Sequence, residues 1–229
     1  MSSAVSLPMT DSAADSGTAT AARKRPKPGE RRVQILQALA TMLEQPGVER
    51  VTTAALAARL QVSEAALYRH FASKAQMFEG LIEFIELSIF SLVNQITADP
   101  VDMPADPHAG VQQAQHIVTV LLQFGEKNPG MTRVMAGDAL VFENERLQLR
   151  MNQFFDKIEA SLRQCLRRLA PDASTATPTV DATVQASVMT AFVIGRLQRF
   201  ARSGFRRVPT EHLHASLHRL TSGPGLPPS

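Results

Sequence analysis

The sequence predicts an all-α protein in which three short helices form an N-terminal helix-turn-helix domain and a larger helical bundle follows. Apolar residues recur at steps of three and four through most of the chain, which is the spacing of one helix face. Ser and Thr stand where helix starts are expected, and Gly or Pro where stops are expected. No hairpin dipeptide lies between segments of alternating polarity, so strand signals are weak throughout.

The chain begins with a segment that does not predict a packed structure. Residues 1–29 have low hydrophobicity, and Pro26, Pro28 and Gly29 interrupt any helix. We therefore expect a disordered tail over 1–29 that ends in a basic arm. Such a charge run is either a solvated tail or an arm that lies along a DNA groove. Its basic residues are Arg23, Lys24, Arg25, Lys27, Arg31 and Arg32, opposed only by Glu30.

Residues 30–73 predict three short helices. The first starts at Glu30 and is stopped by Pro46-Gly47. Thr52-Thr53 offers an N-cap for the second helix, and Ser63 caps the third. The apolar positions have the spacing that locks two short helices at a steep angle, so that one can protrude. These positions are Val51, Leu56, Ala57, Leu60, Val62, Ala66, Leu67 and Phe71.

Residues 74–222 predict the helical bundle, and residues 223–229 a flexible C-terminus. The first bundle helix runs from 74 to about 97, and Ser73 and Gln76 form an S-x-x-Q capping box at its start. Further helices are expected at about 110–124, at 132–169 with a break near Ala136-Gly137, and at 181–202 and 211–220, with a Pro/Thr-rich link over 171–179.

The third helix has the composition of a helix that contacts DNA. Small side chains at Ala65 and Ala66 allow close approach to base edges and thymine methyl groups. Hydroxyls at the start of the second helix can meet a phosphate. We therefore predict a helix that enters a DNA major groove; the alternative is an ordinary bundle in which Tyr68 packs and Arg69 is solvated. The predicted DNA-binding residues are Arg31, Thr52, Thr53, Ser63, Ala65, Ala66, Tyr68, Arg69, His70 and Lys74.

The first bundle helix carries apolar residues on more than one face. At about 100° per residue, one apolar stripe falls within roughly 80°. Phe84 lies about 140° from the centre of that stripe, and Leu87 is nearly opposite it. Either the helix is sandwiched between head and body, which would bury Met77, Leu81 and Phe84, or Phe84 belongs to an exposed patch that docks a partner. The stripe consists of Phe78, Ile82, Ile85, Ile89, Val93 and Ile96.

Composition bounds the remaining functions. The formal charge of +3 only hints at a polyanionic partner, and the lone Cys165 excludes an intrachain disulfide and fits a cytoplasmic protein. No segment resembles a signal peptide or a membrane span. No catalytic set, phosphate-binding loop or group of metal ligands emerges, so we expect neither an enzyme nor a metal or cofactor. A solvated face or pairing with carboxylates, rather than a second nucleic-acid site, is expected for Arg196, Arg199, Arg202, Arg206 and Arg207.

The head resembles the N-terminal domain of TetR-family regulators. The similarity is carried by TTAALA (52–57) and VSEAALYRHFASK (62–74), whose L-Y-x-H-F-x-x-K core is a fairly specific signature. The resemblance implies a TetR-like fold that binds a palindromic site in double-stranded DNA. It also implies a homodimer in which the C-terminal pair of helices packs against its twofold mates.

Segments further along the chain resemble a narrower group of that family, the nucleoid occlusion factors. This resemblance implies a nucleoid-associated inhibitor of cell division that DNA activates and that binds the tubulin-like protein FtsZ. The alternative is a ligand-responsive transcriptional repressor of the TetR type. The segments are LIEFIE (81–86), FGEKNPGMTR (124–133), RLQLRMNQFFDKIEASLRQ (146–164) and RFARSGFRRVPT (199–210).

The same resemblance places a surface for the division protein on the bundle. The residues that it assigns to this surface are Phe84, Lys127 and Asn128. The chain departs from the group in its long tail, in its Pro/Thr-rich insertion, and at Ala55 and Leu92, where basic side chains are expected.

Overall fold

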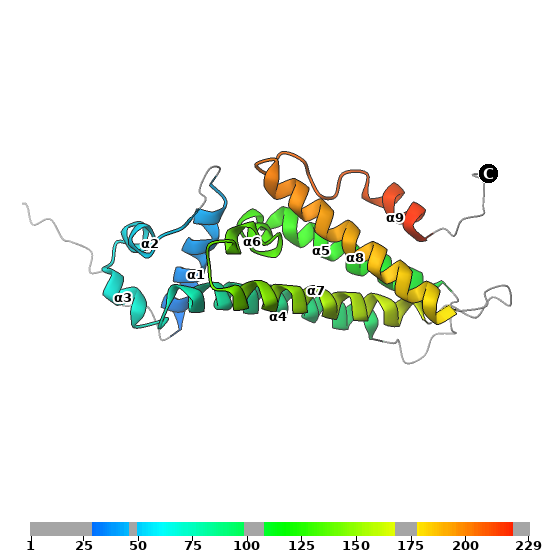
Figure 1. The fold of residues 1–229 in the computed structure, drawn as a ribbon, viewed down its shortest axis with the longest axis horizontal. Coiled ribbons are helices and arrows are strands. Elements are labelled where there is room, and N and C mark those ends of the chain that lie inside the picture. Colours follow the sequence, from blue (N-terminus) through cyan, green and yellow to red (C-terminus); the bar gives the residue numbers. More distant parts are fainter. Residues whose placement is uncertain (1–28, 46–49, 99–107, 168–177, 222–229) are drawn as a thin grey trace, which may run out of the picture.

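The computed structural model describes residues 29–45, 50–98, 108–167 and 178–221. Within these ranges all regular secondary structure is helical, so the predicted all-α class is confirmed. Figure 1 shows a small helical head at the left and a longer helical body at the right. The basic arm up to residue 28, most of the Pro/Thr-rich link and the C-terminus lie outside the described residues.

Three short helices form the head: α1 (Glu30–Leu43), α2 (Thr53–Leu60) and α3 (Glu64–Tyr68). Thr52 and Ser63 are the N-caps of α2 and α3, as predicted. Each hydroxyl oxygen accepts a hydrogen bond from the backbone amide three residues further on, at 3.2 and 3.3 Å. These bonds satisfy amides that have no partner inside the helix.

The helix α3 is only five residues long, because the chain turns immediately after it to bury Phe71. The turn is closed by the amides of His70 and Phe71, which both donate to the carbonyl of Leu67. From α1, Arg32 donates to the His70 carbonyl at 2.5 Å, and its guanidinium lies 4.2 Å from the centre of the Phe71 ring. Among the residues predicted to lock the head, the buried ones are Val51, Leu56, Ala57, Leu67 and Phe71. The half-buried ones are Leu60, Val62 and Ala66.

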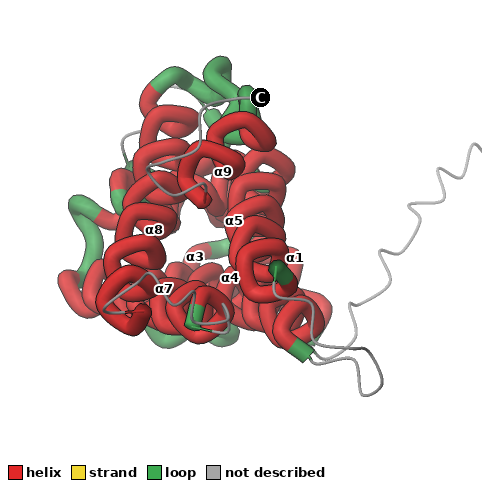
Figure 2. The backbone as a smooth tube through the Cα atoms, turned by 90° about the vertical axis from the view of Figure 1, so that its right-hand side faces the viewer, coloured by secondary structure: helices red, strands yellow, loops and turns green. Residues whose placement is uncertain are grey.

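The body is a bundle of longer helices around one apolar core. In Figure 1, α4 and α7 run side by side along the lower edge with α8 above them, and Figure 2 shows the bundle end on. The short helix α9 packs on α5 and α8. The elements are α4 (Lys74–Thr97), α5 (Ala109–Lys127), α6 (Pro129–Met135), the 3-10 turn η1 (Asp138–Leu140), α7 (Glu145–Leu166), α8 (Pro178–Arg202) and α9 (Leu213–Thr221).

The start of α4 follows the predicted capping box with one difference. The Ser73 hydroxyl accepts from the Gln76 amide at 3.2 Å. The Gln76 side chain reaches one residue further back than predicted, because its carbonyl oxygen accepts from the amide of Ala72 at 2.9 Å. Two exposed amides are satisfied at the point where the head joins the body.

The helical path is broken over residues 136–144, a longer break than the one predicted near Ala136-Gly137. Gly137 has φ 85°, a left-handed conformation that glycine adopts without steric cost. Asn144 then caps α7, with its side-chain oxygen accepting from the Arg146 amide at 3.1 Å. The segment predicted as one interrupted helix therefore forms two helices, α6 and α7, joined by a turn.

The head packs on the body through α1 and α6. Gly130 in α6 lies so close to α1 that a Cβ atom at this position would come within 2.0 Å of the Ala40 carbonyl oxygen. Next to this contact, Arg133 donates to the Leu43 carbonyl at 3.4 Å and pairs with Asp138 at 2.8 Å. A glycine therefore permits the close approach of the two helices.

Ion pairs also join α4 to the start of α7. The hydrogen bond from Arg150 to Glu86 raises the pKa of that guanidinium above its ordinary value. The most enclosed pair contains Lys74, the first residue of α4, whose side chain is 18% exposed. The three pairs are Lys74–Glu143, Glu79–Arg146 (2.7 Å) and Glu86–Arg150 (2.6 Å).

In the part of the chain that the structure describes, no helix is long and apolar enough to cross a membrane. Over the same ranges, no group of three or more His, Cys, Asp or Glu side chains is placed to hold a metal ion. Cys165 is buried in the core, as its apolar helical neighbours predict.

Candidate DNA-binding and partner surfaces

The outer face of α3 presents side chains that were predicted to contact DNA. Ser63, Ala65, Tyr68 and Arg69 are exposed, whereas Leu67 points into the core of the head. Tyr68 is 45% exposed, so the alternative in which it packs inside a bundle does not hold. Because Ala65 adds little bulk, a base edge or a thymine methyl group can approach this face.

The start of α2 offers a second set of groups beside α3. The Thr52 side chain is exposed, and its oxygen accepts from the Ala55 amide, so its hydroxyl hydrogen remains able to donate to a phosphate. Thr53 donates to the Glu64 carboxylate at 2.6 Å and thereby links the first turns of α2 and α3. Of the two predicted threonines, Thr52 is the one whose hydroxyl faces solvent.

The turn between α2 and α3 depends on an unusual backbone conformation. Gln61 has φ 55°, the left-handed conformation that ends a helix and is usually taken by glycine. The next amide, of Val62, donates to the Ala57 carbonyl at 3.0 Å. The left-handed conformation of Gln61 was not predicted, because glutamine is not a residue that favours turns.

Three other predicted DNA-binding residues have partners inside the protein. Arg31 donates to the Gln34 side chain at 2.9 Å, and the carbonyl of the half-buried His70 is taken by Arg32. The ammonium of Lys74 pairs with Glu143 across the junction to α7, so in the protomer it holds α4 in place. Arg32, which was predicted only as part of the basic arm, fixes the turn after α3.

The structure decides between the two alternatives for α4. Phe84 is 49% exposed and Leu87 is 67% exposed, so an apolar strip faces solvent on this helix. Met77 and Leu81 are buried, as a sandwiched helix requires, but the cover does not extend to Phe84. Phe90 is half-buried and packs edge to face on Phe154, with ring centres 5.6 Å apart. The predicted core stripe is buried except for Ile96, which is half-buried.

The other two predicted partner residues lie where α5 meets α6. Lys127 is exposed at the end of α5. Asn128 is half-buried, and its side-chain amide donates to the Phe124 carbonyl at 2.8 Å, which closes the end of α5 before Pro129 begins α6. Asn128 therefore shapes the junction, whereas Lys127 presents a charge to solvent. Phe84 lies on a neighbouring helix, since α4 packs against α5.

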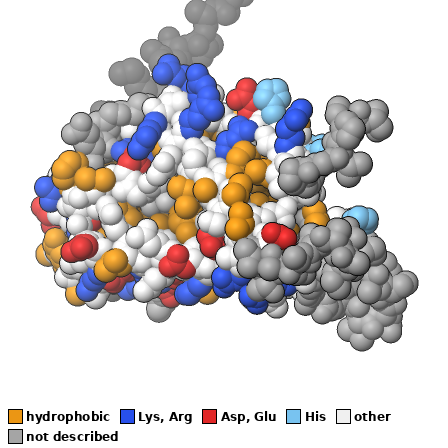
Figure 3. Space-filling view, turned by 45° about the vertical axis from the view of Figure 1, so that its right-hand side comes forward, with side chains coloured by type: hydrophobic (Ala, Val, Ile, Leu, Met, Phe, Trp, Pro, Cys, Tyr) orange, Lys and Arg blue, Asp and Glu red, His pale blue; other side chains and the backbone are white. Residues whose placement is uncertain are grey.

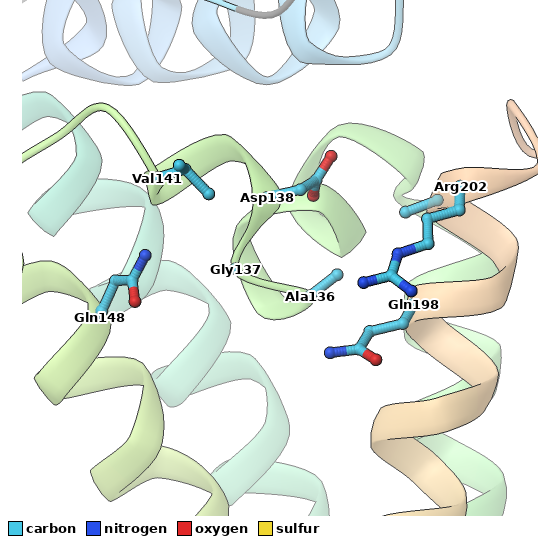
Figure 4. A pocket seen from close by; sticks show the side chains of 8 residues that line it. Ala136, Gly137, Asp138, Val141, Gln148, Gln198 and Arg202 are labelled. Carbon is cyan, nitrogen blue, oxygen red and sulfur yellow. The ribbon is translucent and has the colours of Figure 1, made fainter.

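A hollow of about 280 Å³ opens between η1 and the facing ends of α7 and α8 (Figure 4). In this view the side chains of Gln148 and Gln198 reach toward the space from α7 and α8, and the Arg202 guanidinium enters it from the end of α8. The hollow is therefore polar along much of its wall.

Two family models match different parts of the chain. Residues 35–81 match the family described as bacterial regulatory proteins, tetR family. Residues 109–222 match the family described as tetracyclin repressor-like, C-terminal domain, of the SlmA-like type. The first match covers the head and the start of α4, and the second covers α5 to α9.

Two relatives that match most of the chain carry the same name. The nucleoid occlusion factor SlmA of Aliivibrio fischeri (strain MJ11) is 49% identical over 190 residues, which is 82% of this chain and 93% of that protein. The protein of the same name from Escherichia coli O1:K1 / APEC is 49% identical over 197 residues, or 85% of this chain and 94% of that protein.

Solved structures show the same fold at low identity. The fatty acid degradation regulator FadR from Bacillus halodurans superposes with a TM-score of 0.65 at 14% identity, over 86% of this chain and 97% of that chain. The TetR-family regulator PfmR from Thermus thermophilus also gives 0.65, at 20% identity, over 86% and 98% of the two chains.

Proposed function

This chain belongs to the family of the nucleoid occlusion factor SlmA, within the TetR-like regulators, and we propose that it is a DNA-activated inhibitor of cell division. It binds double-stranded DNA as a homodimer, acts on FtsZ polymers over the chromosome, and lies with the nucleoid in the cytoplasm. The observation that carries the DNA-binding part is the exposed face of α3, where Tyr68 and Arg69 stand beside the small Ala65.

DNA binding uses the head as a helix-turn-helix. The face of α3 enters the major groove, where Ala65 lets the backbone approach and Tyr68 and Arg69 lie against bases or phosphates. Thr52 donates to a phosphate from the start of α2. Since one head contacts only one half-site, a twofold dimer accounts for a palindromic site.

The homodimer is supported by the outer face of α8. Val184, Val188, Ala191 and Gly195 are exposed at steps of four, three and four residues, so they form one stripe along the helix. A Cβ atom at Gly195 would meet nothing within 4 Å in the protomer. Glycine inside a helix costs about 1 kcal/mol relative to alanine. Close approach of the same helix from a second copy gives this glycine a structural reason.

The FtsZ surface uses the apolar strip on α4. Phe84 and Leu87 are large apolar side chains that remain 49% and 67% exposed in the described protomer, and a partner segment buries them on binding. Lys127 supplies a charge from the end of α5, and Asn128 holds the α5–α6 junction in shape. Binding at this surface is proposed to follow DNA binding, because a DNA site favours one arrangement of the dimer.

Sedimentation of FtsZ polymers tests this function. With GTP present, the wild-type protein together with its DNA site should lower the pelleted fraction of FtsZ more than the protein alone. Phe84→Ala should keep its affinity for the site duplex and lose most of the effect on polymers. Leu149→Ala, which also removes an exposed apolar side chain but on α7, is the matched control and should behave as the wild type.

Two outcomes contradict the proposal. If cognate DNA leaves the polymers unchanged while a small molecule releases the protein from DNA, the chain is a ligand-responsive repressor, and the hollow beside Arg202 is the place to seek the ligand. If Phe84→Ala lowers the melting temperature by several degrees, Phe84 supports the fold and does not dock a partner.

A further inference from the structure

A group of arginines lies where α8 ends and the chain turns toward α9. Between residues 182 and 210 the sequence has five arginines and no Asp or Glu. Figure 3 shows Lys and Arg side chains gathered over the upper edge of the molecule. Arg196 is engaged within the protein, because it donates to Ser216 at 3.1 Å and lies 4.9 Å from the centre of the Phe192 ring. The other four are exposed, and no ion pair joins them to a carboxylate within the described ranges: Arg199, Arg202, Arg206 and Arg207.

The end of α8 is a Schellman motif, which fixes the direction of the chain beyond the helix. Gly204 has φ 61°, and its amide donates to the Ala201 carbonyl at 3.1 Å. The amide of Phe205 donates to the Phe200 carbonyl at 3.0 Å. The rings of Phe200 and Phe205 meet edge to face with centres 5.2 Å apart, which is the apolar contact that completes the motif.

Ser203 then holds the two arginines that follow. Its hydroxyl oxygen accepts from the amides of Arg206 at 3.1 Å and Arg207 at 2.9 Å. Its carbonyl oxygen accepts from Nε of Arg206 at 3.0 Å. Further along, Thr210 is hydrogen-bonded to Glu126 of α5, so the turn is anchored at both ends. The backbone that presents Arg206 and Arg207 to solvent is therefore held in one conformation.

The helix dipole explains only part of this cluster. Basic residues are favoured in the last turn of a helix, which accounts for Arg199 and Arg202. Arg206 and Arg207 lie beyond the helix, where the dipole effect has faded. Arg206 and Arg207 place two adjacent guanidinium groups on an anchored turn, and no acidic side chain precedes them over residues 182–205. Such a pair is suited to bind an anionic ligand outside the protomer.

We propose that this arginine turn, residues 199–207, binds the phosphate backbone of duplex DNA as a second contact that does not depend on sequence. Guanidinium groups bind phosphate oxygens through paired hydrogen bonds. Duplex DNA carries one negative charge per about 1.7 Å of its axis, and the proposed function places this protein on it. The described part of the head over 29–73 carries five basic and three acidic side chains, whereas the turn over 199–207 carries four arginines and no acidic side chain.

The turn engages a segment of DNA other than the one that α3 contacts. In Figure 1, α3 lies at the lower left, whereas the link from α8 to α9 lies along the upper edge of the body, with α1 and α6 between them. A duplex that takes α3 into its major groove contacts the head, whereas the turn is carried by the body. A dimer can therefore hold its site with the two heads and attach a second duplex through the two turns.

A DNA bridging assay tests this inference. A duplex with the specific site is fixed to beads, the full-length protein is added, and recovery of a labelled duplex without the site is measured. The wild type should recover it, and Arg206→Ala/Arg207→Ala should lose most of the recovery. Arg163→Ala/Arg167→Ala is the matched control, since it removes the same charge from the far end of α7 and should bridge normally.

Salt dependence gives a second readout that does not need a functional head. Binding to a non-specific duplex is measured over a salt series, and each phosphate contact adds about 0.9 to the slope of log K against log salt concentration. The slope of Arg206→Ala/Arg207→Ala should fall by roughly 2 per protomer bound, whereas the control variant keeps the wild-type slope. Arg206→Lys/Arg207→Lys retains the charge and should retain most of the slope.

Equal bridging and equal slopes for the wild type and Arg206→Ala/Arg207→Ala would overturn the inference. The same holds if the alanine variant bridges DNA normally but loses binding to polyglutamate or to anionic vesicles, because the turn would then serve an acidic protein or a lipid surface. Failure of the wild type to bind a short site duplex would count against the proposed function of the head, while the non-specific salt series would still test the turn.

Discussion

Removing the charge of Glu143 should destabilise the junction between α4 and the start of α7. Glu143 lies just before α7 and pairs with Lys74, the first residue of α4, and the two side chains are 8% and 18% exposed. Glu143→Gln leaves the ammonium of Lys74 without its counter-charge at a site largely removed from water. Breaking a buried pair in this way costs about 3–5 kcal/mol, and the partial exposure of Lys74 places this pair near the lower limit, at about 3 kcal/mol.

Urea unfolding, followed by circular dichroism, measures this loss. Glu79→Gln is the matched control, because it breaks a parallel pair to Arg146 whose side chains are 30% and 55% exposed. Exposed pairs contribute about 0.2–1 kcal/mol, so the control should lose far less stability. Replacing both partners, Lys74→Met with Glu143→Leu, should cost less than Glu143→Gln, since no charge remains unpaired.

DNA binding to a short site duplex shows whether this reasoning is right. If Lys74 only holds α4 on α7, Lys74→Met and Glu143→Gln weaken binding to a similar degree and leave the salt dependence of binding unchanged. A slope that falls by about 0.9 per protomer in Lys74→Met alone would reveal a phosphate contact and refute the assignment. A loss of stability in Glu143→Gln no larger than that in Glu79→Gln would refute it as well.

Three further substitutions test single steps. Tyr68→Ala should lower affinity for the site duplex about tenfold, because it removes one groove contact. The melting temperature should not fall, because the ring is 45% exposed. Unchanged affinity in fluorescence anisotropy would remove Tyr68 from the interface. Gly130→Ala should lower stability by about 2 kcal/mol in urea unfolding, because its Cβ would come within 2.0 Å of the Ala40 carbonyl, and an unchanged midpoint would contradict this packing. Gly195→Leu should keep the helical content of the protomer but yield monomers in sedimentation equilibrium, and an intact dimer would place the interface elsewhere.

Local features of the head could be predicted because they depend on neighbours in sequence. Thr52, Ser63 and Ser73 cap helices as predicted, since a cap needs only a hydroxyl and an amide three residues on. The end of α3 was not predicted, because the turn that stops it is held by Arg32 from a different helix. The left-handed Gln61 was missed for a related reason: its conformation is imposed by the packing of α2 on α3.

The same distinction between local and long-range contacts applies to the site residues. The periodicity of α3 left open whether Tyr68 packs or faces solvent, and the structure shows its side chain 45% exposed. The pairing of Lys74 could not be predicted, because Glu143 lies 69 residues away and meets it only after the bundle forms. For Phe84 the helical angles left two alternatives, and the structure shows this side chain exposed while Met77 and Leu81 are buried.

The amino-acid sequence by itself determined the helical class, the caps, the head that contacts DNA and the apolar residue pattern of α4. These properties come from interactions within a few residues, whose geometry the backbone sets. Only the tertiary structure decided that Lys74 pairs with Glu143, that Phe84 faces solvent, and that Arg206 and Arg207 are held outward on an anchored turn. The reason is physical: burial, ion pairing and exposure depend on which helices meet, and those contacts join residues far apart in the chain.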